Sequence, residues 1–177
     1  METRQEAFHL HDAMAADHAR LECMFRDVLA ILHGSDRDAV RSAWLALEAG
    51  LTSHINFEEC SMLPAFEFGF PLEAAQIRRE HRQIREALAQ LGIDLELHEL
   101  RADAAELFIK RLRKHATRED TLFYVWAEAH VSDDQQQSLV QRFRSWFARE
   151  DIGHPPKKGP VARPPGPRDH DGEKLVG

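Results

Sequence analysis

The sequence has few cysteines, few glycines and no long apolar run. Its 177 residues include only Cys23 and Cys60, without CxxC spacing, which argues against a disulfide framework or a thiolate zinc site. We expect both to be free thiols at core positions. Glycine is sparse before residue 153 and strand-like alternation is absent, which favours an all-α fold. No apolar segment reaches about 18 residues and the N-terminus lacks a signal-peptide pattern, so we expect a cytoplasmic protein that does not enter membranes.

Basic residues are also fewer than acidic residues. The formal net charge is −7, and the segment from Gly153 onward carries five basic and three acidic residues, so the rest of the chain carries −9. Because an acidic body repels a phosphate backbone, nucleic acid is excluded as a partner. The HExxH, P-loop and GxSxG motifs are absent.

Four long segments show the three- and four-residue spacing of apolar side chains that is typical of buried helix faces. Gly34 ends the first segment, Ser35 caps the second, Pro71 opens the third and Gly92 ends it. The predicted helices span residues 6–33, 36–66, 71–91 and 97–129.

A capping box at Ser132-Asp133-Asp134-Gln135 predicts a fifth, shorter helix that ends near Glu150. Short turns between long helices favour an antiparallel up-down-up-down four-helix bundle, with the fifth helix on its outside or at a dimer contact. We therefore expect one helical domain over residues 1–152. Residues 153–177 are rich in proline, glycine and charge, which predicts a disordered tail.

Histidines and glutamates stand near the middle of these helices. A histidine and a glutamate four residues apart share one helix face, and this spacing occurs in two of the four segments. A single histidine on such a face is usually a hydrogen-bonded core residue. Four of them with two paired glutamates are different, because burying ionisable groups without a partner costs several kcal/mol each. The pattern predicts a shared metal site made by His18, His54, Glu58, His81, His115 and Glu119.

The donor types narrow the choice of metal. Imidazole nitrogen and carboxylate oxygen without thiolate suit iron, manganese or zinc. Six side chains are too many for one tetrahedral zinc ion, but they suit two octahedral ions about 3.5–4 Å apart. We therefore expect two iron ions, with manganese or zinc as the less favoured choices.

Over about residues 7–130 the chain resembles the hemerythrin family, specifically the small bacterial HHE cation-binding domains. The resemblance implies a four-helix bundle around a non-haem di-iron centre, in which two carboxylates and an oxo or hydroxo group bridge the ions. It also implies ligand roles for the six residues named above. The motifs that show the resemblance are Asp17-His18, His54-x-x-x-Glu58-Glu59 followed by Leu63-Pro64, Glu80-His81, and His115-x-x-x-Glu119-Asp120 followed by Leu122-Phe123.

The chain departs from oxygen-carrying hemerythrins at two places. Carriers have a second histidine in the third helix where this chain has Arg85, and they use a carboxylate five residues after the fourth-helix histidine, here Asp120. We prefer Glu119 as the bridge because it repeats the geometry of the other pair. The lost histidine leaves a coordination position for water, an external ligand or a further side chain, for which the candidates are Glu22, Glu86 and His11. Tyr124 is assigned to core packing.

The four-histidine pattern looks more like HHE proteins associated with O2, NO or iron sensing than like oxygen carriers. The leading hypothesis is a non-haem di-iron protein that binds O2, NO or a related small ligand, or senses or stores iron, without substrate turnover. The alternative is a di-iron enzyme that acts on peroxide or NO, or donates iron for repair of iron–sulfur clusters. In a third interpretation the metal only stabilises a regulatory bundle. A homodimer is compatible with each of them.

Overall fold

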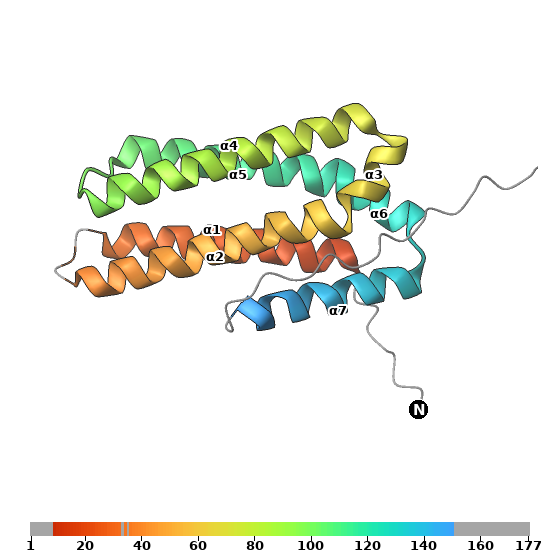
Figure 1. The fold of residues 1–177 in the computed structure, drawn as a ribbon, viewed down its shortest axis with the longest axis horizontal. Coiled ribbons are helices and arrows are strands. Elements are labelled where there is room, and N and C mark those ends of the chain that lie inside the picture. The colour runs from red at the N-terminus through yellow and green to blue at the C-terminus, as the bar shows by residue number, and fades with distance from the viewer. Residues whose placement is uncertain (1–8, 33, 35, 151–177) are drawn as a thin grey trace, which may run out of the picture.

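The computed structural model describes residues 9–32, 34 and 36–150, and all regular structure within them is helical (Figure 1). The predicted tail from residue 153, Ser35 and the first residues of the predicted first helix lie outside the described residues. The helices are α1 (Leu10–Ile31), α2 (Arg37–Ser61), α3 (Leu63–Gly69), α4 (Pro71–Glu96), α5 (Ala102–Arg118), the π-helix η1 (Glu119–Phe123), α6 (Tyr124–His130) and α7 (Asp133–Glu150).

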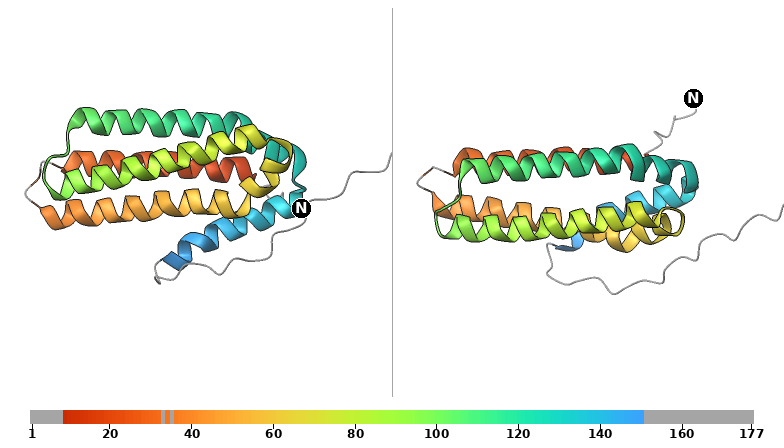
Figure 2. Two further views of the ribbon diagram at one scale, coloured as in Figure 1. Left: turned by 45° about the horizontal axis from the view of Figure 1, so that its top comes forward. Right: turned by 90° about the horizontal axis from the view of Figure 1, so that it is seen from above.

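The four long helices form two antiparallel pairs. Helices α1 and α2 make one pair, α4 and α5 make the other, and the two pairs pack on each other as a bundle (Figures 1 and 2). The predicted fold class is therefore confirmed. Helix α7 lies on the outside, against α2 and α1. Among the described residues, none of the helices combines the length and the apolar character that a membrane span needs.

Two predicted helix starts are confirmed and one is corrected. Pro71 is the first residue of α4, and Ser132 receives the expected side-chain contact, its N–H donating to Gln135 Oε1 at 3.3 Å. At the start of α2 the cap is Asp36, because its carboxylate accepts from the backbone N–H of Ala39 at 2.9 Å.

Gly92 does not end its helix. Helix α4 continues to Glu96 because Gly92 is a packing position, where an added Cβ would lie 3.1 Å from Trp44 Nε1. The chain turns at His98, whose φ of 62° is in the left-handed region that follows many helix ends. The next helix therefore begins at Ala102 and not near Leu97.

Two of the predicted helices are interrupted near the same end of the bundle. The predicted helix over 36–66 breaks at Met62, and Pro64, which has no backbone N–H, lies in the first turn of the short α3. The predicted helix over 97–129 contains the π-helix η1, which separates α5 from α6. The break at Met62 follows Glu58 by one turn, and the π-helix begins at Glu119 itself, so both affect which side chains reach the interior.

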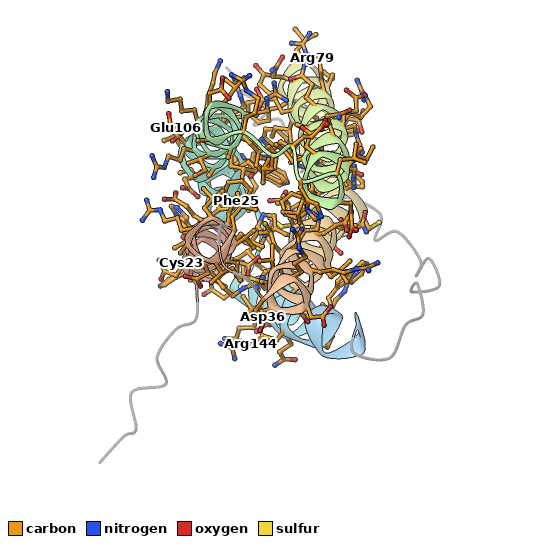
Figure 3. All side chains as sticks on the ribbon, turned by 90° about the vertical axis from the view of Figure 1, so that its left-hand side faces the viewer. Cys23, Phe25, Asp36, Arg79, Glu106 and Arg144 are labelled. Atoms are coloured by element: carbon orange, nitrogen blue, oxygen red, sulfur yellow. The ribbon has the colours of Figure 1, made fainter. Side chains whose placement is uncertain are left out.

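The core is divided into two apolar clusters with a polar layer between them. One cluster contains Leu21, Phe25 and Ile84, and the other contains Met14, Phe57 and Ile77. Figure 3 shows Phe25 directed into the bundle and Cys23 directed away from it. Both cysteines are in fact exposed, so their predicted core positions are wrong: Cys23 lies two residues from each of the buried Leu21 and Phe25, off the inward stripe.

Candidate metal centre

Each of the four long helices places one histidine in the polar layer, at a position flanked by apolar core residues. His18 of α1 lies one turn from both Met14 and Leu21, and His81 of α4 lies similarly between Ile77 and Ile84. Because of the i, i+3 and i+4 spacing, each imidazole lies on the same inward-facing side of its helix as the buried core residues. His54, His81 and His115 are buried, and the His18 side chain is 14% exposed.

The Nε2 atoms of all four histidines point at two fully buried carboxylates. Glu58 Oε1 lies 3.5 Å from His54 Nε2, and Glu58 Oε2 lies 3.2 Å from His81 Nε2. Glu119 lies 3.2 Å from the Nε2 atoms of both His18 and His81, and 3.0 Å from that of His115. Two ligand atoms of one ion at about 2.1 Å stand about 3 Å apart when they subtend a right angle, so these distances suit coordination.

The six side chains form two groups of potential ligand atoms, and the glutamates belong to both. In each group one ligand atom per residue lies within 4.8 Å of the others. The first group holds His18 and His54, the second holds His81 and His115, and each includes Glu58 and Glu119. Each group could hold a metal ion, and the two groups share both carboxylates.

The outward Nδ1 atom of each imidazole faces a carboxylate on a neighbouring helix. Each of these carboxylates belongs to a residue directly before or after one of the six site residues in the sequence. Together the four contacts connect each helix to the next and form a ring around the bundle. Such carboxylate–histidine contacts set the orientation of a metal-binding imidazole. The Nδ1-to-oxygen distances are 2.8 Å for His54–Asp17, 3.0 Å for His81–Glu59, 3.0 Å for His115–Glu80 and 3.4 Å for His18–Asp120.

Arginines hold three of these carboxylates from the outer side. Arg20 donates to Asp17 at 2.6 Å, and Arg118 donates to Glu80 at 3.0 Å. Arg85 donates to both oxygens of Glu59, at 3.0 and 3.2 Å. Arg85, which stands where oxygen carriers have their second histidine, thus orients the carboxylate that contacts His81.

The concentrated carboxylates raise the pKa values of the histidines. Burial opposes protonation of His18, but the carboxylates of Asp120 and Glu119 outweigh it and raise its pKa to about 9. The same balance, with Glu119 as the main anion, raises the pKa of His115 to about 9 and that of His81 to about 11. Without metal at neutral pH, protons therefore occupy these imidazoles.

Several atoms in the polar layer have no hydrogen-bond partner among the described residues. They include Nε2 of His54 and of His115 and one oxygen each of Glu58 and Glu119, each of which lies at ion-pair distance from another site residue but without hydrogen-bond geometry. Buried polar atoms are normally paired, so their convergence needs an explanation. A cation held by nitrogen and hard oxygen donors supplies one, and the residues present fit a pair of iron, manganese or zinc ions.

Tyr124 is a site residue that the sequence analysis assigned to core packing. Its O–H donates to Glu58 Oε1 and lies 3.5 Å from His18 Nε2. Burial and the charges of Glu58 and Glu119 raise the pKa of the phenol well above its usual value, so it remains protonated. The only tyrosine of the chain is thus a hydrogen-bond donor at a shared carboxylate.

The π-helix explains why the sequence pattern missed this residue. Five residues of α-helix would turn Tyr124 roughly 140° away from Glu119. In η1 the N–H of Tyr124 instead bonds to the carbonyl of Glu119, a step of five residues, which brings both side chains to the same face. The available signal was the lone tyrosine on a helix that already carried two site residues.

The other candidates from the sequence lie outside both ligand groups. Glu22 forms surface ion pairs with Arg26 and Arg113, and Glu86 is exposed. His11 lies 3.7 Å from Glu128. Asp120 faces the outer nitrogen of His18, whereas Glu119 faces the inner nitrogens, so the geometry favours Glu119 as the shared carboxylate.

The fold and this cluster define a helical bundle whose interior histidines and glutamates could hold a metal ion. The sequence matches the hemerythrin HHE cation binding domain over residues 9–127, and the chain belongs to that family. The matched range includes all six of the histidines and glutamates and ends before α7. No match to a curated protein or to a solved structure was found at the significance threshold.

Asp17→Asn is expected to weaken metal binding by about 10–100-fold, because the neutral amide polarises and orients the His54 imidazole less well. Competition with a chromophoric chelator measures this affinity. The control is Asp27→Asn, which removes an exposed carboxylate from the same helix. Equal affinities of the two variants would show that the contact between Asp17 and His54 does not support metal binding.

Tyr124→Phe is expected to lower the free energy of unfolding by about 2 kcal/mol, because a hydrogen bond to a buried carboxylate is lost. Metal content should remain unchanged, since all six histidines and glutamates of the two ligand groups are kept. Urea unfolding and elemental analysis provide the two measurements. Thr121→Val removes an exposed hydroxyl from η1 and should change stability by less than about 0.5 kcal/mol. A Tyr124→Phe protein without bound metal would contradict the expectation.

Proposed function

We propose that the protein holds two iron ions and binds O2, NO or a related small ligand, or senses or stores iron, in the cytoplasm. His18 and His54 would bind one ion, and His81 and His115 the other. Glu58 and Glu119 would bridge them. The observation that carries the proposal is the overlap of the two ligand groups at these two fully buried glutamates.

The number of protein donors supports a ligand-binding role. Each ion would have two histidines and two shared carboxylates, which is four donors for a metal that prefers six. Bound iron supplies reversible coordination of small diatomic ligands at such positions. The protein's own contribution is to exclude bulk water, because the polar layer lies between two apolar clusters. His18 is the most exposed of the six residues, so its side of the bundle is the nearest access for a ligand.

Titration of the iron(II)-loaded protein with NO tests this function. We expect a visible absorption band that develops with ligand and saturates, and that is absent from the zinc-loaded protein. His18→Ala should weaken the band, because it removes a donor from one group only. Iron-loaded protein whose spectrum does not respond to NO or O2 would overturn the ligand-binding role.

One observation favours the second candidate function, a di-iron enzyme that acts on peroxide or NO. The protonated Tyr124 hydroxyl, next to Glu58, is a proton donor of the kind that reductive chemistry uses. Catalytic turnover of peroxide or NO that is abolished in Glu58→Ala and slowed in Tyr124→Phe would establish the enzyme. Ligand binding without turnover would establish the binding protein.

A further inference from the structure

Positive charge is concentrated in two short segments of an otherwise acidic protein. Residues 78–85 of α4 and 110–118 of α5 carry nine arginines and lysines and one carboxylate, that of Glu80. These segments have a formal charge of +8, whereas the whole chain has −7, so the rest of the chain carries −15. The segments also contain His81 and His115, so this charge lies at the height of the candidate metal centre.

Five of the nine cations have no carboxylate partner among the described residues. Ion pairs engage Arg78 with Glu67, and Arg85, Arg113 and Arg118 with carboxylates described above. The remaining five form what we call the basic belt. It consists of Arg79, Arg82, Lys110, Arg111 and Lys114, of which all but the half-buried Arg111 are exposed.

The belt is one surface because contacts between α4 and α5 bring its two halves together. Arg111 donates to the backbone carbonyl of Gln83 at 3.1 Å, and Arg118 reaches across to Glu80. Figure 3 shows α4 and α5 side by side, with Arg79 on the outer edge of α4. The exposed carboxylates of Glu86 and Glu106 bound the belt in the sequence.

Two hydrogen bonds connect the edge of this surface to the candidate metal centre. The Nδ1 atom of His115 lies 3.0 Å from Glu80 Oε2, and the guanidinium of Arg118 lies 3.0 Å from the other oxygen of Glu80. The Arg118 side chain is 34% exposed, whereas that of His115 is 6% exposed. A molecule bound at the belt is thus separated from the site by one layer of bonded side chains.

We propose that the basic belt is the docking surface for an acidic electron-transfer protein that exchanges electrons with the metal centre. Eight helical residues span about 12 Å, which suits the small interfaces of transient redox complexes. A longer polyanion such as duplex DNA would extend over the surrounding negative charge. The electron exchange rests on the proposed di-iron function, whereas the docking does not. Each reduced partner gives up one electron, and one ferric ion becomes ferrous.

The sign of the salt dependence provides a sharp test. The probe is a reduced plant-type ferredoxin of net negative charge, mixed with the ferric protein in a stopped-flow instrument. If net charges governed the encounter, two anionic proteins would react faster as salt screens their repulsion. Docking at the belt predicts the reverse, a rate that falls about tenfold between 20 and 200 mM salt. A rate that rises with salt overturns the proposal.

Charge reversal locates the docking surface. The double variant Arg79→Glu, Lys114→Glu breaks no ion pair with a described carboxylate, and it should lower the rate at low salt at least about tenfold. The control is Arg37→Glu, Arg142→Glu, which makes the same change in net charge on α2 and α7, also without breaking an ion pair with a described carboxylate, and should stay within about twofold of the wild type. Equal losses in both double variants would overturn the proposal, as would displacement of the ferredoxin by duplex DNA.

A binding measurement separates failure of the docking from failure of the proposed iron chemistry. Fluorescence anisotropy of labelled ferredoxin with the zinc-loaded protein reports docking without electron transfer. Binding that is lost in the belt variant and kept in the control supports the docking surface. If such binding is seen but the iron-loaded protein accepts no electron from ferredoxin, the docking surface stands and the redox role fails. Absence of binding by the zinc-loaded wild type overturns the docking surface itself.

Discussion

Glu119→Gln is expected to prevent binding at both of the proposed metal positions. Glu119 belongs to both ligand groups and lies within 3.2 Å of three imidazoles, so its loss weakens both positions at once. His18→Ala, by contrast, removes a donor from one group only and should leave about one ion per chain. Elemental analysis after loading with iron(II) and removal of free metal gives the content, with about two ions expected for the wild type.

The neighbouring carboxylate supplies the matched control for this experiment. Asp120→Asn changes the next residue of the same π-helix, whose carboxylate faces the outer nitrogen of His18. It should retain both ions with reduced affinity. If Asp120→Asn lost both ions while Glu119→Gln kept them, the assignment of the shared carboxylate would have to be reversed.

The metal-free protein is expected to become less stable as the pH rises from about 6.5 to about 9. Carboxylates hold the pKa values of His18 and His115 near 9 against the opposing effect of burial, whereas the unfolded value is 6.5. A raised pKa in the folded state contributes stability that is complete below the unfolded pKa and is lost as the pH passes the folded one. The loss should be of the order of 1 kcal/mol per pH unit for each titrating histidine. Urea midpoints of the chelated protein measure it.

The loaded protein should not lose stability in this way over the same pH range. Metal binds the neutral imidazole, so binding at pH 7 releases protons and becomes tighter as the pH rises. The gap in Tm between loaded and chelated protein should therefore widen from pH 6.5 to 9. Calorimetric titration in buffers of different ionisation enthalpy counts the released protons. A urea midpoint of the chelated protein that stays flat or rises above pH 6.5 would contradict the expectation.

Acid should destabilise the chelated protein through different residues. Hydrogen bonds from the histidines and arginines hold the pKa values of Glu59 and Glu80 near 2, against the opposing effect of burial. A lowered pKa contributes stability that is present above the unfolded value of 4.5 and is lost as the pH falls toward 2. Together with the histidine effect, this places the most stable pH range of the chelated protein between about 4.5 and 6.5.

The sequence predicted the all-α bundle and the family, and both are confirmed. It also selected the six side chains that the structure brings together, because a four-residue spacing on a helix is a local property that the backbone enforces. The role of these residues as metal ligands stays a prediction. The predicted helix boundaries were less accurate. Helix α4 continues past Gly92 because that glycine packs against Trp44, a residue distant in the sequence, and the second predicted helix breaks at Met62.

Contacts between helices required the tertiary structure. The position of Tyr124 depends on the π-helix, which shifts every later side chain of that segment by about one residue. The ring of carboxylates behind the histidines depends on how far each helix is rotated about its axis, as the contact between Asp17 and His54 shows.

The sequence by itself determined which residues lie on the inward face of each helix, and hence the kinds of donor atoms available to a cation. Only the tertiary structure decided that two glutamates are shared between two histidine pairs and that a tyrosine joins them. The physical reason is that helical periodicity repeats along a single chain segment, whereas distances between segments follow from packing of the whole bundle.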